Sequence, residues 1–463
     1  MSRDRPAGDL TQGPLLLRLV TFGVPLVLGM FFHSLFNLVD LIIVGKLGPW
    51  ALAAVNQASI PNFIPMLLSN GVSTASIAVI SRNFGMRNYK RANANTLQGF
   101  LLLAGMAVAL GWPSYVYALE LNQLVGSTGQ ALLPATEYLE ISSAGLFTMF
   151  ALMQVTAVLR AGGNARWPMF LLVGANVLNV GLTIALVFGW WIFPEMGVAG
   201  AAWGTVIARG LFALLGLYVI TRRGSPVRLD LRRIRIRPRM MSQLVRLGIP
   251  SSMQFVVRVV VWGAILRFVN VFGEAEEVHA ALAVGLRLDM LALFTGAGWG
   301  AAGAAMVGQC LGAGMPERAR RAGLYATVLG LITMVGIGIL FWVFARWLMV
   351  VFGEDPSVKP EFASAVAFGV EYLRIAVFAY PFVAIGITLA QCLNGAGSTK
   401  TPLALDTFGY LMVQIPAVAY IASRHAEWPR TYLWWSIVAT AALVAVFYVL
   451  VWHRGHWMKK KLR

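Results

Sequence analysis

The chain has 463 residues, of which 58% are hydrophobic and only 12% are charged, and its mean hydropathy is +0.72. Soluble domains carry about a quarter charged residues, so this composition excludes an ordinary soluble protein and indicates an all-α polytopic membrane protein. The net charge of +18 requires no nucleic-acid partner, because the basic residues follow the pattern of loops on one side of a membrane.

Apolar segments recur from end to end, each long enough to cross roughly 30 Å of bilayer. We predict twelve transmembrane helices, near residues 15–44, 52–80, 93–121, 134–159, 167–190, 197–220, 244–272, 278–310, 320–352, 362–393, 402–424 and 430–453. They are expected to form two pseudo-symmetric six-helix bundles. The predicted units are an N-terminal lobe (1–220), a basic linker (221–243), a C-terminal lobe (244–453) and a basic tail (454–463).

The first segment carries a stripe of polar side chains. His33, Asn37 and Asp40 are spaced four and three residues apart, so they share one face of a helix. Pro25 lacks the N–H that the helical ladder needs, and we expect a hinge there. A charged side chain at membrane depth costs a few kcal/mol or more, so Asp40 is a candidate functional residue.

Two chemical roles fit Asp40. It can take up and release protons, or it can supply a hard oxygen ligand to a metal ion such as Na⁺. A structural ion pair with an arginine or lysine elsewhere in the bundle is the alternative. For His33, a hydrogen-bonded position in the core is favoured over a functional role.

Polar residues continue through the first half. Asn62 of the second segment lies in a stripe of serines, which can line a cavity but more often provides hydrogen bonds between helices. The fifth segment contributes Asn176 and Asn179, and the sixth contributes Thr205.

The second half has a different set of polar residues. Its first helix carries Gln254 and Arg258, and the next carries Arg287 and Asp289. Because a lone buried charge is costly, we expect Asp289 to pair with one of the arginines, and a role in coupling or gating is the alternative. Asp406 lies near the cytoplasmic end of the eleventh segment, where partial solvation is expected.

Lysine and arginine are concentrated in alternate connections. The odd-numbered loops hold only Lys46, Lys359, Arg424 and Arg430, whereas the termini and the even-numbered loops are rich in basic residues. By the positive-inside rule, both termini and the linker are predicted to be cytoplasmic, in a multi-pass protein of the inner (plasma) membrane.

The two halves of the sequence repeat one another. GVP at 23–25 returns as GIP at 248–250. Residues 71–92 align with 298–319, and LRAGGNARWP at 159–168 aligns with LNGAGSTKTP at 393–402. Six spans separate equivalent positions, so the repeats are parallel. Transporters built from such repeats bind substrates at the repeat interface and alternate access by rocking the halves.

These repeated stretches, with others, resemble the multidrug and toxic compound extrusion (MATE) family, bacterial type, of the larger oligosaccharide-flippase superfamily. The further matching stretches are FNLVDLIIVGKLGPWALAAV at 36–55, NVLNVGL at 176–182, GVAGAAWGT at 197–205 and VGQCLGAGMPERA at 307–319. The resemblance implies two six-helix lobes around an outward-facing V-shaped cavity. It also implies export of amphipathic, often cationic compounds in exchange for protons or sodium ions.

The resemblance also implies roles for individual residues. Asp40 matches the first-helix acid implicated in cation coupling, and Pro25 matches the proline about which that helix bends. Asn179 matches an asparagine of the cation site, and Thr205 matches its threonine. Thr183 stands where many members carry a second aspartate; a hydroxyl is a weaker ligand, which favours protons over sodium.

We therefore predict a secondary antiporter and no enzyme activity. The candidates for the substrate cavity are His33, Asn37, Asn62, Asn176, Gln254, Arg258 and Asp289. No cofactor is expected beyond H⁺ or Na⁺ as the coupling ion, with Na⁺ at Asp40 as the one candidate metal. The expected partners are small amphipathic substrates and membrane lipids, with the protein acting as a monomer. A flippase for a lipid-linked saccharide or cell-wall precursor is the alternative, and Arg258 and Arg287 inside the spans favour it.

Overall fold

The computed structural model describes residues 8–190, 192–222, 229, 235–272, 275–352 and 363–460. Within α-helices, the side chains of Asn37, Leu38, Leu41, Pro49, residues 275–280 and Phe352 also lie outside this description. The described chain is almost entirely helical and contains no strand.

Two sets of helices follow one another along the chain. Those of the first half are α1 (Leu15–Gly45), α2 (Pro49–Gly85), α3 (Tyr89–Val116), α4 (Ala118–Leu124), α5 (Leu132–Ala144), α6 (Leu146–Ala161), α7 (Arg166–Val187) and α8 (Gly197–Thr221). Those of the second half are α9 (Pro238–Val269), α10 (Ala275–Gly312), α11 (Pro316–Val343), α12 (Ala345–Phe352), α13 (Ala363–Ala376), α14 (Tyr380–Gly395), α15 (Lys400–Asp406), a π-helical turn (Thr407–Gln414), α16 (Ile415–Ser423) and α17 (Thr431–Arg454).

The number of membrane spans agrees with the prediction. Eleven helical stretches of the described chain are long and apolar enough to cross a membrane. The pair α5–α6, which is bent by 48° where the two helices meet, passes the same test as one unit and brings the number to twelve if it is one span. The predicted fold class, an all-α polytopic membrane protein with up to twelve spans, is confirmed.

Several predicted boundaries were wrong. The span predicted at 320–352 is divided between α11, which ends at Val343, and α12, and the span predicted at 362–393 is divided between α13 and α14. The span predicted at 93–121 ends at Val116, because the backbone leaves helical geometry at Tyr117 and α4 starts afresh. The span predicted at 134–159 is two helices that meet at Gly145. Helix α9 begins at Pro238, inside the predicted linker 221–243, because a proline ring fits the first turn of a helix. Residues 223–228 and 230–234 of that linker lie outside the described residues.

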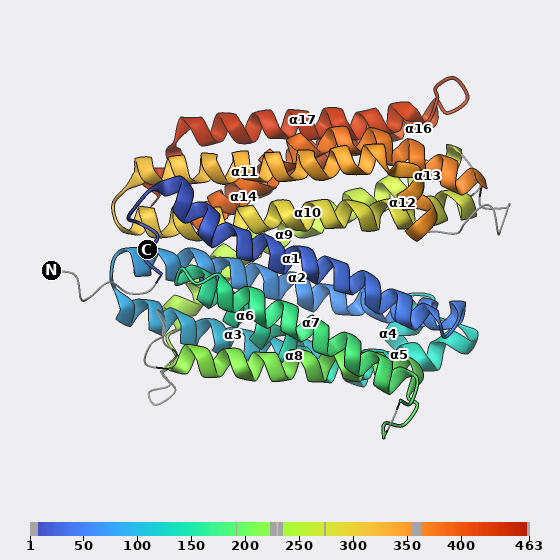
Figure 1. Cartoon of the computed structure of the whole chain (residues 1–463), viewed down its shortest axis with the longest axis horizontal. Coiled ribbons are helices and arrows are strands. Elements are labelled where there is room, and N and C mark those ends of the chain that lie inside the picture. Colours follow the sequence, from blue (N-terminus) through green and yellow to red (C-terminus); the bar gives the residue numbers. More distant parts are fainter. Residues whose placement is uncertain are drawn as a thin grey trace.

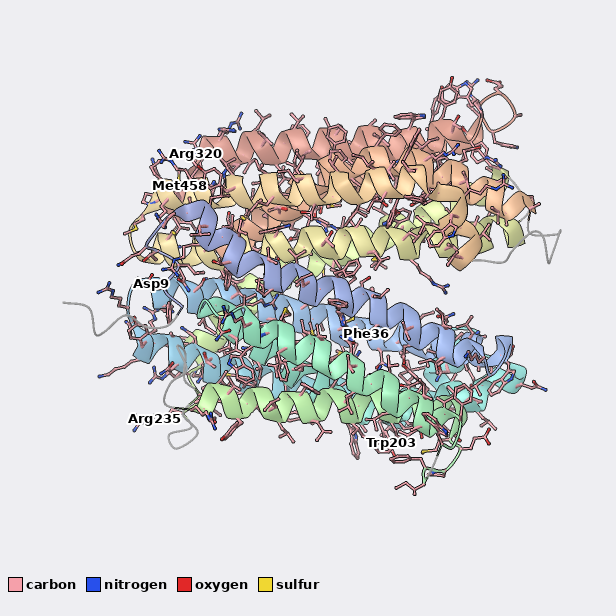
Figure 2. All side chains as sticks on the ribbon, in the orientation of Figure 1. Asp9, Phe36, Trp203, Arg235, Arg320 and Met458 are labelled. Carbon is pink, nitrogen blue, oxygen red and sulfur yellow. The ribbon has the colours of Figure 1, made fainter. Side chains whose placement is uncertain are left out.

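The helices of the two halves form two bundles (Figure 1). Helices α1–α8, coloured blue to green, lie together, and α10–α17, coloured yellow to red, lie on the other side. Most contact between the halves is made by α1 and α2 against α9 and α10. The start of α1 and the end of α17 lie at the same end of the molecule, here called the terminal end, and the opposite end is called the far end (Figure 1). Arg235 and Arg320 lie toward the terminal end, and Trp203 lies toward the far end (Figure 2).

Backbone contacts between the bundles occur in pairs that follow the sequence repeat. A β-carbon on Gly85 of α2 would lie 2.0 Å from the carbonyl oxygen of Gln309, and one on Gly312 of α10 would lie 2.1 Å from that of Arg82. Gly85 is equivalent to Gly312, and Arg82 to Gln309, in the alignment of residues 71–92 with 298–319. Glycine is required at both positions because the helices approach each other backbone to backbone.

The turns obey the same symmetry. The loop after α6 uses Gly163 with φ +76°, and the loop after α14 uses the equivalent Gly397 with φ +81°. The loop after α2 uses Arg87 with φ +57°, and the loop after α10 uses the equivalent Gly314 with φ +73°. The left-handed region favours glycine, and at Arg87 it accompanies a turn in which the N–H of Arg87 donates to the carbonyl oxygen of Phe84 at 2.9 Å. These pairs show that the repeat is structural as well as sequential.

Gln309 holds the bundles together at the terminal end. Its Oε1 accepts a hydrogen bond from the backbone N–H of Leu10 at 3.0 Å. Its Nε2 donates to the carbonyl oxygens of Ala161 at 2.9 Å and Gly8 at 3.4 Å. The side chain thus joins α10 of the second bundle to the N-terminal segment and to the end of α6 in the first bundle.

Replacing Gln309 with alanine is expected to loosen the terminal end. Each lost hydrogen bond costs about 1 kcal/mol, so the closed arrangement should lose roughly 1–3 kcal/mol. The adjacent Cys310 is fully buried, and its alkylation by a water-soluble maleimide in detergent-solubilised protein should rise about tenfold for each 1.4 kcal/mol. Cys392, buried in the same core cluster, is the internal control. Unchanged labelling of Cys310 would contradict the role given to Gln309.

Candidate functional site

Asp40 lies where α1 meets α7. The Nδ2 of Asn179 donates to the Oδ1 of Asp40 at 3.4 Å. One turn further along α7, the Oγ1 of Thr183 donates to the Oδ1 of Asn179 at 3.4 Å, and Thr183 is buried. The structure therefore brings three of the predicted coupling residues into one chain of hydrogen bonds that ends on the carboxylate.

The fourth predicted coupling residue, Thr205, lies on the neighbouring helix α8. Its hydroxyl donates to the carbonyl oxygen of Ala201 at 3.0 Å, within its own helix. Gly204, beside it, lets α8 approach the backbone of Thr183 closely. Thr205 therefore flanks the site, while its hydroxyl proton is engaged elsewhere.

Two groups near Asp40 were missed by the sequence analysis. Arg209 on α8 and Tyr138 on α5 both interact electrostatically with Asp40. Among the ion pairs of the described residues, none includes Asp40. The signal for Arg209 was present in the sequence: it is a lone cation inside the sixth apolar segment, four residues after Thr205 and so on the same helical face.

His33 lies where α1 faces both α7 and α10. Its Nδ1 is 3.2 Å from the Nδ2 of Asn176, which also donates to the carbonyl oxygen of Leu172 at 2.7 Å. The imidazole meets the ring of Phe294 on α10 edge to face, with centroids 5.9 Å apart. His33 therefore has the hydrogen-bonded position that the sequence favoured.

Two further predictions concern α1. The side chain of Asn37, a candidate for the substrate cavity, lies outside the described residues. Helix α1 continues through Pro25, so the helix is not interrupted at the position of the predicted hinge in this structure.

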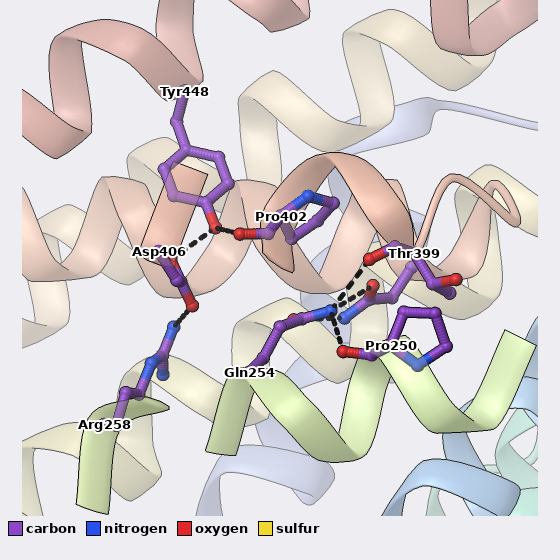
Figure 3. Close-up of polar contacts among 8 residues, drawn as sticks. Pro250, Gln254, Arg258, Thr399, Pro402, Asp406 and Tyr448 are labelled. Atoms are coloured by element: carbon purple, nitrogen blue, oxygen red, sulfur yellow. Dashed lines mark hydrogen bonds and ion pairs between the residues drawn. The ribbon is translucent and has the colours of Figure 1, made fainter. Parts of the chain in front are cut away.

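Gln254 is committed to a buried amide network in the second bundle (Figure 3). Its Nε2 donates to the Oδ1 of Asn394 at 3.2 Å and to the carbonyl oxygen of Thr399 at 3.1 Å. In return, the Nδ2 of Asn394 donates to the Oε1 of Gln254 at 3.0 Å. Because its amide is satisfied within the bundle, Gln254 is positioned to fasten α9 to the α14–α15 loop rather than to contact a substrate.

Arg258 forms an ion pair with Asp406 (Figure 3). Its Nη2 lies 3.1 Å from the Oδ2 of Asp406, and the hydroxyl of Tyr448 donates to the Oδ1 at 2.7 Å. The side chain of Asp406 is 0% exposed and that of Arg258 is 32% exposed. The expectation that Asp406 is partly solvated is wrong, because side chains from α9 and α17 cover it.

Asp289 is buried but has no cation paired with it among the described residues. The hydroxyls of Tyr372 on α13 and Tyr380 on α14 both donate to its carboxylate, the second at 2.7 Å. The prediction that Asp289 pairs with an arginine is wrong. Arg287 is two residues away and projects from another side of α10. Arg258 forms its ion pair with Asp406 instead.

Asn62 is the last of the predicted candidates. It lies in α2 directly after Pro61, and its Oδ1 is buried without a hydrogen-bond partner among the described residues. Such an unsatisfied buried acceptor costs about 1–3 kcal/mol, so it marks a position that is poorly explained by packing alone.

The site at Asp40 offers one carboxylate with neutral hydrogen-bond donors and one cation, Arg209, that interacts with it electrostatically. No cluster of three or more His, Cys, Asp or Glu side chains suited to a metal ion occurs in the described chain. The amide of Asn179 turns its N–H group, not its oxygen, toward Asp40. The site thus places one carboxylate beside a hydrogen-bonded amide and hydroxyl.

Comparison with known proteins gives consistent matches over nearly the whole chain. The family model described as MatE matches residues 25–185 and 250–421, once in each half. "Probable multidrug resistance protein YpnP" of Bacillus subtilis is 29% identical over 428 residues, covering 90% of this chain and 91% of the relative. "Probable multidrug resistance protein NorM" of Thermotoga maritima is 25% identical, covering 92% and 90%.

Solved structures share the fold. A crystal structure of MATE in complex with MaL6 superposes with a TM-score of 0.91 at 22% identity, covering 99% of this chain and 100% of the other. A MOP superfamily transporter from Pyrococcus furiosus, described as having a binding pocket of reverse polarity, gives 0.89 at 22% identity with the same coverage. An outward-facing multidrug resistance MATE transporter gives 0.87 at 23% identity, again with 99% and 100% covered.

Proposed function

Because this chain belongs to the MatE family of multidrug transporters, we propose that it is a secondary antiporter that exports amphipathic, cationic compounds in exchange for protons. The observation that carries the proposal is the Asp40 site. A single acid at membrane depth accepts a hydrogen bond from Asn179, which Thr183 orients in turn. An exchangeable charge there gives the protein a group through which an ion gradient can act.

The coupling ion we propose is H⁺. Sodium requires several oxygen ligands and is held best by more than one acid, whereas the neutral Thr183 on α7 stands beside Asp40 and leaves this group of residues with one carboxylate. A proton needs only the carboxylate. When Asp40 takes up the proton, its attraction for the Asn179 N–H and for Arg209 weakens, and the junction of α1, α7 and α8 loosens.

The proposed cycle uses the repeat. From the charge pattern of the loops, we propose that both termini lie in the cytoplasm and that the protein spans the inner (plasma) membrane. The terminal end is then the cytoplasmic gate, and the contacts of Gln309 with Leu10 and Ala161 hold it shut. Proton uptake from outside displaces substrate outward, α1 bends near Pro25, and the bundles rock to open the terminal end. We propose that a monomer carries out this cycle, because the groups named in it lie on one chain.

A flippase for a lipid-linked saccharide or cell-wall precursor is the second candidate. Such a protein would use cationic side chains to hold a pyrophosphate group. Arg258 is neutralised by Asp406, which leaves less positive charge for that purpose than the sequence suggested. Arg287 is half-buried in α10 and remains the feature that favours this alternative.

Transport in proteoliposomes tests the proposal. Vesicles loaded with a fluorescent cationic dye should release it when a pH gradient is imposed, and not when a sodium gradient of equal size is imposed. Protein-free vesicles and a protonophore are the controls. Release driven only by sodium would overturn proton coupling, and movement of a lipid-linked saccharide without dye release would establish the flippase.

A further inference from the structure

Asp289 is a buried acid that the cycle described above does not use. It is 6% exposed, on α10 of the second bundle. Two tyrosine hydroxyls donate to it, from Tyr372 on one side of the break between α13 and α14 and from Tyr380 on the other. No lysine, arginine or histidine of the described chain forms an ion pair with it.

The other buried acid of the same bundle provides a comparison. Asp406 is as deeply enclosed, but the guanidinium of Arg258 compensates its charge at 3.1 Å. Moving an ionised carboxylate out of water costs several kcal/mol unless a nearby cation or enough hydrogen-bond donors offset that cost. Two neutral hydroxyl groups offset less of this desolvation cost than a guanidinium group does. Of these two acids, Asp289 would therefore be stabilised more by binding a cation.

The sequence repeat shows what stands at these positions in the first bundle. When the alignment of residues 71–92 with 298–319 is continued back along α2 and α10 without a gap, Asp289 is equivalent to Asn62. When the alignment of 159–168 with 393–402 is continued in the same way, Tyr372 is equivalent to Tyr138. The helices also resume at the same aligned place, because α6 begins at Leu146 and α14 begins at the equivalent Tyr380.

Equivalent tyrosines thus accompany an acid in both bundles. In the first bundle, Tyr138 interacts with Asp40 of the first helix. In the second bundle, Tyr372 donates to Asp289 of the second helix. The residue equivalent to Asp40, in the alignment that matches GVP at 23–25 with GIP at 248–250, is Ile265, which is buried. The acid therefore stands on the neighbouring helix, while the tyrosine keeps its place.

We propose that Asp289 is a proton-binding site of the second bundle, which makes the protein able to exchange protons in both halves. The inference rests on the proposed proton coupling for its role in transport, but proton binding itself does not. The carboxylate takes one proton on one oxygen, and no covalent bond other than the new O–H changes. The tyrosine that faces that oxygen turns its hydroxyl away and becomes the acceptor.

The side chains around Asp289 connect this change of hydrogen bonds with helix α1. Tyr372 and Tyr380 are the titratable groups that face it from the packed helices, and Arg287 on its own helix points elsewhere. Tyr380 belongs to a hydrophobic cluster against which Phe31 and Leu35 of α1 pack. This cluster therefore connects the hydrogen bonds at the α13–α14 break with the helix that carries Asp40.

Infrared difference spectroscopy of the purified protein tests the proposal without any gradient or substrate. Between alkaline and acidic buffer, the wild type should gain carbonyl-stretch bands of protonated carboxylic acids. One band should disappear in Asp289→Asn and persist in the matched control Asp406→Asn and in Asp40→Asn. A Tyr372→Phe, Tyr380→Phe variant should retain the band at a shifted frequency, because the hydrogen bonds to the carboxyl group are lost.

Two results decide between the presence and the absence of the site. Loss of a band in Asp289→Asn alone supports it, and identical spectra for the wild type and Asp289→Asn overturn it. Should Asp289→Asn fold poorly, Asp289→Glu keeps the carboxyl group and must shift the same band. Failure of dye export to follow a pH gradient would refute the proposed function while leaving this band in place, so the two failures are separable.

Discussion

Replacing Asp40 with asparagine is expected to lower dye export driven by a pH gradient by roughly tenfold to a hundredfold, the range spanned by typical coupling free energies. The substitution keeps the shape of the side chain and removes its ability to change charge. Asn179 can still find an acceptor at the amide oxygen, so the fold around α1 and α7 should persist. Proteoliposome efflux with an imposed pH gradient is the measurement.

Loss of coupling must be distinguished from loss of the protein's shape. Exchange of labelled for unlabelled dye across the membrane, with no gradient, should continue in Asp40→Asn, because that exchange needs the rocking of the bundles and not the proton. Asp40→Glu, which retains a carboxylate, should recover part of the driven export. Undiminished gradient-driven export in Asp40→Asn would show that the coupling group lies elsewhere.

The membrane spans and the repeat were predictable because each follows from a local pattern. Hydropathy finds apolar stretches whatever their neighbours, and helices α1, α7, α8 and α17 lie within a few residues of their predictions. The repeat was visible as short similar stretches, and these mark backbone contacts and left-handed turns such as those at Gly163 and Gly397. Glycine in such places is dictated by geometry, so it stands in both halves.

Partners of the buried charges were not predictable, because they depend on how each helix is rotated about its axis. Arg258 and Arg287 were the cations expected to pair with Asp289, yet one faces Asp406 and the other projects from a different side of α10. The tyrosines that do reach Asp289 lie more than eighty residues further along the chain. Arg209 was within reach of sequence reasoning and was overlooked, since a lone arginine in an apolar span is itself a signal.

Arg258→Ala is expected to destabilise the protein by about 3 kcal/mol, the lower end of the range for breaking a buried ion pair. The larger part of this cost comes from Asp406, which is 0% exposed and would keep only the hydroxyl of Tyr448. The 32% exposure of Arg258 lets water screen the pair in the wild type, which is why the lower end applies. Thermal unfolding in detergent, followed with a thiol-reactive dye on Cys310 and Cys392, measures the change.

The repeat supplies a matched control for this prediction. His33 follows Pro25 at the same spacing at which Arg258 follows the equivalent Pro250, so the two side chains occupy equivalent positions. His33 bridges to α7 through the neutral side chain of Asn176, as Arg258 bridges to α15 through a charged one. His33→Ala should therefore cost only about 0.5–1.5 kcal/mol, the value of a typical hydrogen bond.

A double variant separates charge from packing at the same place. In Arg258→Ala combined with Asp406→Asn, no uncompensated carboxylate remains, so the protein should be more stable than Arg258→Ala alone despite carrying two changes. If the single and double variants unfold at the same temperature, the cost at Arg258 is lost packing and not an unpaired charge. If His33→Ala lowers the stability of the protein as much as Arg258→Ala does, the ion pair of Arg258 with Asp406 contributes no more than the neutral contact of His33 with Asn176.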